Sequence, residues 1–363
     1  MGWKSTLNRL ELVGRTARYH KIGYSAESLD RPLGDLFLES HATRPEEIVL
    51  DLDATDIPLY GHQPERFFHG YYDSYCYLPL YIFAGDQLLC ARLRAADKDA
   101  AVEAVEEVSR TQRVPGNSGA PALARPRGSP ARIVLRADSG VPTDRSSSVG
   151  WDSGFCREEL MAWCEANEVH YLFGLARNKR LGKIIGAQMQ QARVLHQTTG
   201  KAARVFTGFA YITRNSWSRA RRAVAKAEYL DKGENPRFVV TSLSPDQWPD
   251  QDLYEKFYCA RGEMENRIKE QMCLFADRLS TDEMKGNQLR LYFSALAYTL
   301  MEALRRLGLK GTEWAQAQVD TIRLKLFKIG AIVRISVRRI LLELSSTYPW
   351  KDIFAHAFHA LRC

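Results

Sequence analysis

Acidic residues end two short apolar stretches of the chain, and carboxylates in such positions are potential ligands of a divalent metal ion. Asp51 and Asp53 lie two residues apart in the stretch EIVLDLD at 47–53, so in a strand both would project from the same face. Asp138 ends a second stretch, IVLRAD at 133–138. Carboxylates at the ends of buried strands are costly unless a metal ion or hydrogen bonds compensate for lost hydration. The alternative for each aspartate is a turn or a helix N-cap, where Asp is common.

Another group of polar residues recurs at helical spacing further along the chain. Tyr258, Arg261, Glu265 and Lys269 are separated by three, four and four residues, which places them on one face of a helix. One interpretation is a solvated face with ion pairs between Arg261, Glu265 and Lys269. The other is that Glu265 completes a site for a hard metal ion, with Arg261 and Tyr258 beside it to hold phosphate oxygens.

The patterns around these residues predict an α/β arrangement with a mixed sheet. Short β-branched or aromatic stretches predict strands at 47–53, 75–83, 87–94, 133–138 and 170–176, and the second and third of these form a hairpin. Helical periodicity predicts helices at 95–112 and from residue 155. Strands and helices then alternate after an antiparallel pair, which is typical of a mixed sheet.

The second half of the chain changes character. Residues 201–248 are β-rich around a basic stretch and predict a smaller β insertion, and long amphipathic helices follow from residue 249. The stretch at 319–346 alternates basic and apolar residues, which fits either a strand pair or a strand followed by a helix. Residues 113–131 and 139–151 are rich in Pro, Gly or Ser and predict loops.

Composition excludes several classes of protein. The chain has 363 residues, 45% hydrophobic and 26% charged, which is incompatible with a disordered, collagen-like or coiled-coil protein. Its seven cysteines include no Cys-x-x-Cys pair, so neither a disulfide framework nor a zinc ribbon is indicated. The absence of an apolar run long enough for a membrane helix predicts a soluble cytoplasmic protein.

Positive charge is concentrated in one part of the chain. The net charge is +8, yet twelve Lys and Arg and no acidic residue lie between Glu168 and Glu228. The rest of the chain has a net charge of −4, because 39 Lys and Arg there face 43 Asp and Glu. Such a stretch favours a polyanionic partner, and nucleic acid is the commonest.

Five ordered motifs resemble those of bacterial insertion-sequence transposases of the DDE type. They are LDLDATD at 50–56, FFHGYYDSYCYLPLY at 67–81, DSGFCRE at 152–158, FGLARN at 173–178 and YCARGEMENRIKEQ at 258–271. The resemblance extends from about residue 5 almost to the end of the chain. It implies a ribonuclease H-like mixed sheet with flanking helices, interrupted by a smaller β-rich insertion before the last catalytic helix.

The resemblance divides the chain into five regions. Residues 1–45 are a remnant of an N-terminal DNA-binding region, 46–200 the first part of the catalytic domain, 201–248 the insertion, 249–310 its helical completion and 311–363 a basic C-terminal region. The family usually carries a larger N-terminal region, so the resemblance also raises the prospect of a truncated or decayed element.

The resemblance assigns Asp53 as the first catalytic acid and Glu265 as the third, with Tyr258 and Arg261 in the signature positions before Glu265. The signature lysine would fall at residue 272, which is Met272 here, and Lys269 one turn earlier is the candidate replacement.

The second acid is either Asp138 or Asp152, because an insertion of 14 residues splits the family motif between them. Asp138 is preferred, since a buried strand fixes its position and a Ser-rich stretch precedes Asp152.

The implied activity is metal-dependent cleavage at the element ends followed by strand transfer into target DNA. Asp53, Asp138 and Glu265 would hold Mg²⁺, with Mn²⁺ as an alternative. Double-stranded DNA is the implied partner, with a homodimer formed on DNA in the bacterial nucleoid. Trp217 would stack on an extruded base among neighbouring cations, unless it packs in the β insertion. The cations are Arg214, Arg219, Arg221 and Arg222.

Two other functions remain open at this point. One is a catalytically impaired remnant that binds DNA without transposing. The other is a metal-dependent nuclease of the same fold that cuts DNA and joins nothing.

Overall fold

The structure is a computed structural model that describes residues 25–43, 45–70, 72–98, 101–112, 131–138, 154–277, 279–281 and 283–362. The predicted loops at 113–131 and 139–151 lie almost wholly outside the described residues. Asp152 also lies outside them.

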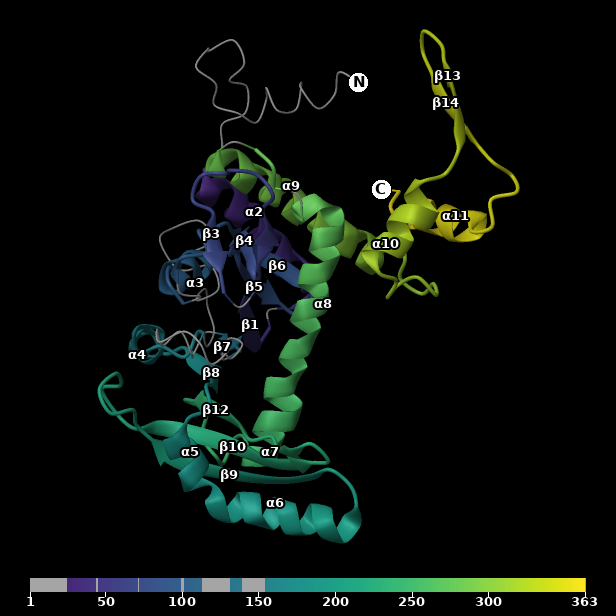
Figure 1. Ribbon diagram of the computed structural model, residues 1–363. Coiled ribbons are helices and arrows are strands. Elements are labelled where there is room, and N and C mark those ends of the chain that lie inside the picture. Colours follow the sequence, from purple (N-terminus) through teal and green to yellow (C-terminus); the bar gives the residue numbers. More distant parts are fainter. Residues whose placement is uncertain are drawn as a thin grey trace.

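A mixed sheet forms the centre of the molecule and confirms the predicted fold class (Figure 1). Its strands lie in the order β6–β5–β1–β7–β8. β1 pairs antiparallel with β5 and parallel with β7, and β8 continues in parallel. This order, with a meander on one side and parallel strands on the other, is that of a ribonuclease H-like sheet. The bounds are β1 (Glu47–Ala54), β5 (Leu80–Ala84), β6 (Gln87–Arg92), β7 (Arg132–Ala137) and β8 (His170–Leu175).

The β-rich segment after residue 200 extends this same sheet. β12 pairs antiparallel with β8, and β10 then joins β12 to β9 and β11, so the sheet has nine strands. The predicted insertion is therefore β-rich, and its strands are continuous with the central sheet. The bounds are β9 (Ala203–Tyr211), β10 (Arg221–Leu230), β11 (Gly233–Glu234) and β12 (Arg237–Thr241).

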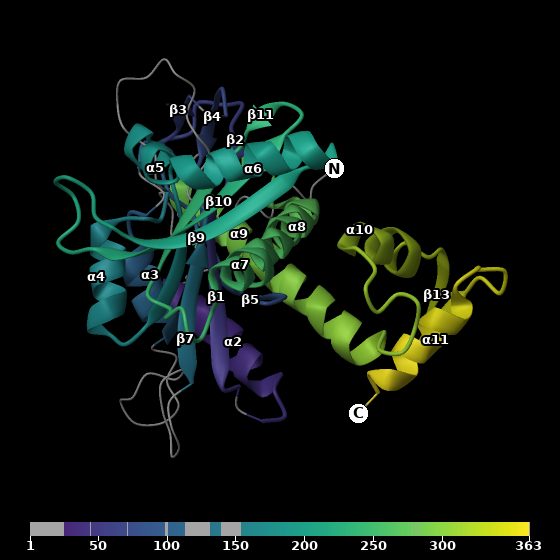
Figure 2. The ribbon, with the colours of Figure 1, turned by 90° about the horizontal axis from the view of Figure 1, so that it is seen from below.

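Helices cover both faces of the sheet (Figures 1 and 2). One face packs against helices that come before or between the strands: α2 (Ala26–Glu39), α3 (Ala104–Gln112), α4 (Glu158–Ala166), α5 (Lys179–Ile184) and α6 (Gly186–Thr199). The other face packs against a long helical run that follows β12. That run contains α7 (Asp250–Asp252), η2 (Leu253–Tyr258), η3 (Cys259–Arg261), α8 (Gly262–Gln271), η4 (Met272–Ala276), α9 (Met284–Ala303) and η5 (Leu304–Gly308).

Alternation along β1 decides which side chains face which helices. Leu50 and Leu52 are fully buried in the core beneath α2, α3 and α4. Asp51 and Asp53 alternate with these leucines along the strand, and successive strand side chains point to opposite faces. Asp51 and Asp53 therefore lie on the side covered by the long helical run.

The predicted strand at 75–83 is two strands, so the first strand of the expected hairpin is shorter than predicted. β4 (Ser74–Tyr77) joins β2 (Ile57–Pro58) and β3 (Phe67–His69) in a small separate sheet, and β5 begins at Leu80. Pro79 lies at the break, where it cannot donate a backbone hydrogen bond to a neighbouring strand. The hairpin itself is formed by β5 and β6.

The C-terminal stretch that the sequence left open contains both kinds of element. α10 (Val319–Ile322) and η6 (Arg323–Phe327) precede a hairpin of β13 (Ala331–Ile335) and β14 (Ile340–Leu344), and α11 (Lys351–Ala360) follows. Trp350, at the start of α11, packs against Trp314 with ring centroids 5.5 Å apart. None of the described helices is both long and apolar enough to cross a membrane.

Candidate active site

Two neighbouring parallel strands position the first two acids. Leu52 in β1 pairs with Ala137 in β7, so Asp53 and Asp138 follow side by side at the carboxyl ends of these strands. Asp53 Oδ1 also accepts a hydrogen bond from the Ala54 amide at 2.9 Å. The predicted convergence of these two aspartates is therefore a consequence of strand register.

The long helical run brings a third acid to the same edge of the sheet. Tyr258 ends η2, Arg261 ends η3, and Glu265 lies one turn later in α8. The Tyr258 hydroxyl donates to Asp138 Oδ1 at 2.8 Å. The Glu265 side chain is half exposed to solvent.

Arg261 lies between all three carboxylates. Its Nη2 donates to Asp138 Oδ2 at 2.6 Å and to Glu265 Oε1 at 3.2 Å. Its Nη1 lies 4.0 Å from Asp53 Oδ2. The residue is only 8% exposed, so one buried guanidinium faces three acids from distant parts of the chain.

The three acids carry more negative charge than Arg261 compensates. Burial raises the pKa of Asp53 to about 7, and the Asp138 and Glu265 carboxylates add to the rise while Arg261 opposes it. Burial, together with the adjacent Asp138, also raises the pKa of the Tyr258 hydroxyl, which keeps it a hydrogen-bond donor. Such a site favours additional positive charge.

The donor set fits a hard divalent cation. Asp53, Asp138 and Glu265 offer only oxygen atoms, which are the ligands that Mg²⁺ and Mn²⁺ prefer. The observation that supports this fit is that three carboxylates face a single guanidinium. Arg261 contacts two of the carboxylates that would hold such an ion, those of Asp138 and Glu265.

An ion pair beneath the site was not anticipated from the sequence. Asp51 is buried and forms a bidentate pair with Arg136 of β7, whose Nη2 donates to Oδ2 at 2.7 Å. Arg136 also donates to the Phe257 carbonyl and so links β7 to η2. The available signal was an arginine inside the buried stretch IVLRAD, which requires a partner.

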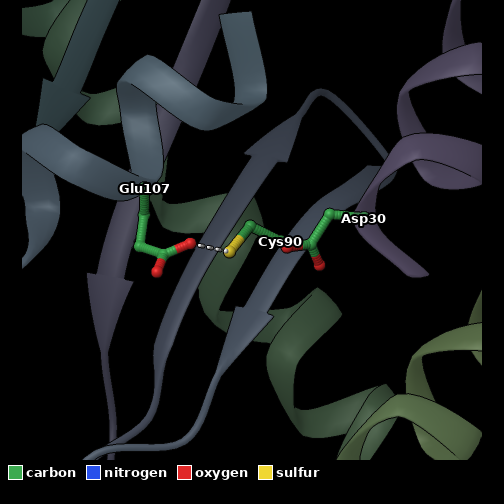
Figure 3. Close-up of side chains that lie close together, drawn as sticks. All are labelled: Asp30, Cys90 and Glu107. Atoms are coloured by element: carbon green, nitrogen blue, oxygen red, sulfur yellow. Dashed lines mark hydrogen bonds between the residues drawn. The ribbon is translucent and has the colours of Figure 1, made fainter. Parts of the chain in front are cut away.

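Three other buried polar side chains form a second cluster, in which the Cys90 thiol donates to Glu107 (Figure 3). The cluster consists of Asp30 of α2, Cys90 of β6 and Glu107 of α3. One potential metal-ligand atom from each of these residues lies within 4.8 Å of the other two. Arg92 pairs with Asp30 at 2.7 Å and with Glu107 at 2.9 Å, and Arg110 also pairs with Glu107. Because two guanidinium groups already match these carboxylates, we interpret the cluster as a structural link between α2, α3 and β6.

Three of the predicted DNA-binding residues contribute to the folded core. Trp217 is 8% exposed and packs edge-on against Tyr211. Arg221 pairs with Glu158 at 2.6 Å and with Glu165 at 2.8 Å. Arg222 pairs with Asp250 and donates to two backbone carbonyls.

Three other predicted DNA-binding cations, Arg214, Arg219 and Lys269, are exposed. Arg214 and Arg219 lie in the connection between β9 and β10, where Arg219 also pairs with Glu165 at 2.8 Å. Lys269 is exposed on α8, two turns beyond Arg261, whereas Met272 in the signature lysine position is half-buried.

Nine of the twelve cations in the basic stretch are exposed. They lie mainly on α5, α6 and β9, at the end of the sheet nearest to α7 in Figure 1. They are Arg177, Lys179, Arg180, Lys183, Arg193, Lys201, Arg204, Arg214 and Arg219.

Two comparisons of the whole chain with known proteins found transposases. One similar solved structure is the cryo-EM structure of the piggyBac transposase synaptic complex with hairpin DNA, at 12% sequence identity and a TM-score of 0.41. The match covers 81% of this chain and 55% of that one, so the chain spans little more than half the length of that protein. No curated protein matches the sequence. The family model for the transposase DDE domain, group 1, matches residues 2–363, and the chain therefore belongs to this family of DDE transposases.

Proposed function

We propose that this chain catalyses metal-dependent cleavage of DNA at insertion-sequence ends and transfer of the freed strands into target DNA. The observation that carries this proposal is the convergence of Asp53, Asp138 and Glu265 on one buried arginine. Membership in the DDE transposase family supports the same reaction.

Asp53, Asp138 and Glu265 are the proposed metal ligands, and Mg²⁺ is the proposed ion, with Mn²⁺ as an alternative. A divalent ion held there would activate the attacking water or 3′-hydroxyl and stabilise the leaving oxygen. The geometry supports Asp138 as the second acid, because Asp138 contacts both Tyr258 and Arg261.

Arg261 and Tyr258 are the proposed phosphate-positioning residues. Both direct hydrogen-bond donors toward the acids, so a scissile phosphate entering the site would meet the same donors. Arginine suits this role because its planar group binds two phosphate oxygens at once. Lys269 on the exposed face of α8 would contact phosphates further along the DNA.

Double-stranded DNA is the proposed partner, with a homodimer as the active form and the bacterial cytoplasm and nucleoid as its location. The nine exposed cations of the basic stretch support DNA binding. Arg214 and Arg219 are the members of the predicted base-binding group best placed to reach DNA. Stacking of Trp217 on a base would require it to leave its present packing against Tyr211.

The test is an end-cleavage assay with duplex DNA that carries the terminal inverted repeats of the element and with Mg²⁺ present. Metal-dependent nicking followed by joining to a target plasmid is the expected result. Nicking without joining would identify a nuclease of the same fold. Binding without nicking would identify the impaired remnant, which is the alternative function.

A further inference from the structure

The C-terminal hairpin of β13 and β14 has one face that is entirely apolar. In its register Ala331 pairs with Leu344, Val333 with Leu342 and Ile335 with Ile340, and residues directly opposite one another share a face. The other face is mixed: Ile332 and Leu341 share it with an ion pair in which Arg334 Nη2 lies 3.2 Å from Glu343 Oε2.

This apolar face is exposed to solvent. Val333 is 54% exposed, Leu342 61%, Ile340 69% and Ile335 77%. The hairpin projects away from the sheet and its covering helices (Figure 1), and it does so again in the view from below (Figure 2). A two-stranded hairpin is marginally stable in water by itself, so a hairpin with a bare apolar face requires a partner.

From this we infer that the apolar face of the hairpin binds the same face of a second copy of this chain and forms a symmetric dimer. A face without charged groups is complementary to itself, which is the requirement for an interface across a two-fold axis. Its six residues expose on the order of 600 Å² per chain, close to the roughly 800 Å² per partner of a standard interface.

Charge placement argues against DNA as the occupant of this face. Contact with a phosphate backbone needs cations, and the apolar face has none. Arg334 lies on the opposite face, paired with Glu343, and Arg338 and Arg339 lie in the turn at the tip. The inference names a surface outside the candidate active site, and it deepens the proposed function by giving the proposed homodimer an interface.

The test uses two variants of the full chain that differ only in which face they change. Val333→Thr with Leu342→Thr alters a directly paired position on the apolar face, whereas Ile332→Thr with Leu341→Thr alters the mixed face. Threonine retains the preference for strands in all four positions. Sedimentation velocity in the absence of DNA measures the dimer dissociation constant, and circular dichroism checks the fold.

We expect wild type and the mixed-face variant to dimerise and the apolar-face variant to dissociate at least about 100-fold more readily, since four buried apolar side chains per dimer are changed. A wild-type chain that stays monomeric over the whole concentration range would overturn the inference. An equal rise of the dimer dissociation constant in both variants would also overturn it. If the wild-type chain is monomeric and the apolar-face variant loses DNA affinity, the face binds DNA instead, which overturns the inference too. An Asp53→Asn chain should dimerise like wild type, which separates this result from any failure of the catalytic proposal.

Discussion

At the scale of single residues, Arg261 is the group that links the three proposed catalytic acids to one another. Its guanidinium contacts Asp138 and Glu265 and approaches Asp53, and these are the proposed metal ligands. A guanidinium and a bound metal ion would therefore compete for the same carboxylates. DNA phosphates would relieve this competition by offering Arg261 another anionic partner.

Replacement of Arg261 by Gln is predicted to tighten binding of Mn²⁺ to the DNA-free chain by roughly 5- to 100-fold, the usual range for such coupling. Isothermal titration calorimetry measures this change. Arg267→Gln is the matched control on the same helix, because Arg267 pairs with Asp86 outside the site. Unchanged or weaker Mn²⁺ binding by the Arg261 variant would show that no competition exists.

Asp30 provides a prediction for the dependence of stability on pH. Burial raises its pKa to about 6, with Glu107 adding to the rise and Arg92 and Arg110 opposing it. Between about pH 4 and pH 6 the unfolded chain has released this proton while the folded chain still holds it, so stability falls as pH rises. The expected loss is about 3 kcal/mol in the free energy of unfolding, from about two pKa units.

Urea unfolding at a series of pH values checks this slope. Asp30→Asn should remove it, and Asp35→Asn, at a partly exposed position of the same helix, should leave it in place. A slope that survives in the Asp30 variant would assign it to another group.

At the scale of secondary-structure elements, the pair of Asp51 and Arg136 joins β1, β7 and η2 directly beneath the acids. Arg136→Met would leave a buried carboxylate without its partner and should reduce the free energy of unfolding by about 3–5 kcal/mol. Arg132 lies on the same strand as Arg136 and forms a partly exposed ion pair with Glu47 of β1. Arg132→Met breaks this pair and should reduce the free energy of unfolding by less than about 1 kcal/mol. Chemical denaturation measures both values, and equal losses would contradict this role for Arg136.

The sequence predicted most of the elements that carry the site, for reasons visible in particular residues. The apolar runs before Asp53 and Asp138 identified two neighbouring strands, and the spacing of Tyr258, Arg261 and Glu265 identified the helical face. The contact of Arg261 with Asp138 joins distant segments, so no local pattern could predict it. The partners that bury Trp217 and Arg221, among them Tyr211, Glu158 and Glu165, were hidden for the same reason.

At the scale of the whole molecule, charge separates the chain into a basic end and a more acidic remainder. The exposed cations of α5, α6 and β9 lie at the opposite end of the sheet from α2 (Figure 1). This distribution supports a DNA-binding surface continuous with the strands β9 and β10. The net charge of +8 is modest, but it indicates a DNA-binding surface because the cations are concentrated at one end.

Lys179→Gln with Lys183→Gln and Arg193→Gln should weaken DNA binding at low salt and reduce the slope of log affinity against log salt by about 2.7, at about 0.9 per phosphate contact. Fluorescence anisotropy over a salt series measures the slope. Arg31→Gln with Lys98→Gln is the control, because both residues are exposed away from the basic end. An unaltered slope in the triple variant would place the DNA elsewhere.

The most direct test of the central claim compares Asp138→Asn with Asp152→Asn in Mg²⁺-dependent cleavage of element-end DNA. The proposed site predicts that the Asp138 variant loses at least about 100-fold in rate, because a ligand of the ion that stabilises the transition state is removed. The Asp152 variant should cleave at a rate close to that of wild type. Normal cleavage by the Asp138 variant, with loss of cleavage by the Asp152 variant, would contradict the assignment of Asp138 to the active site.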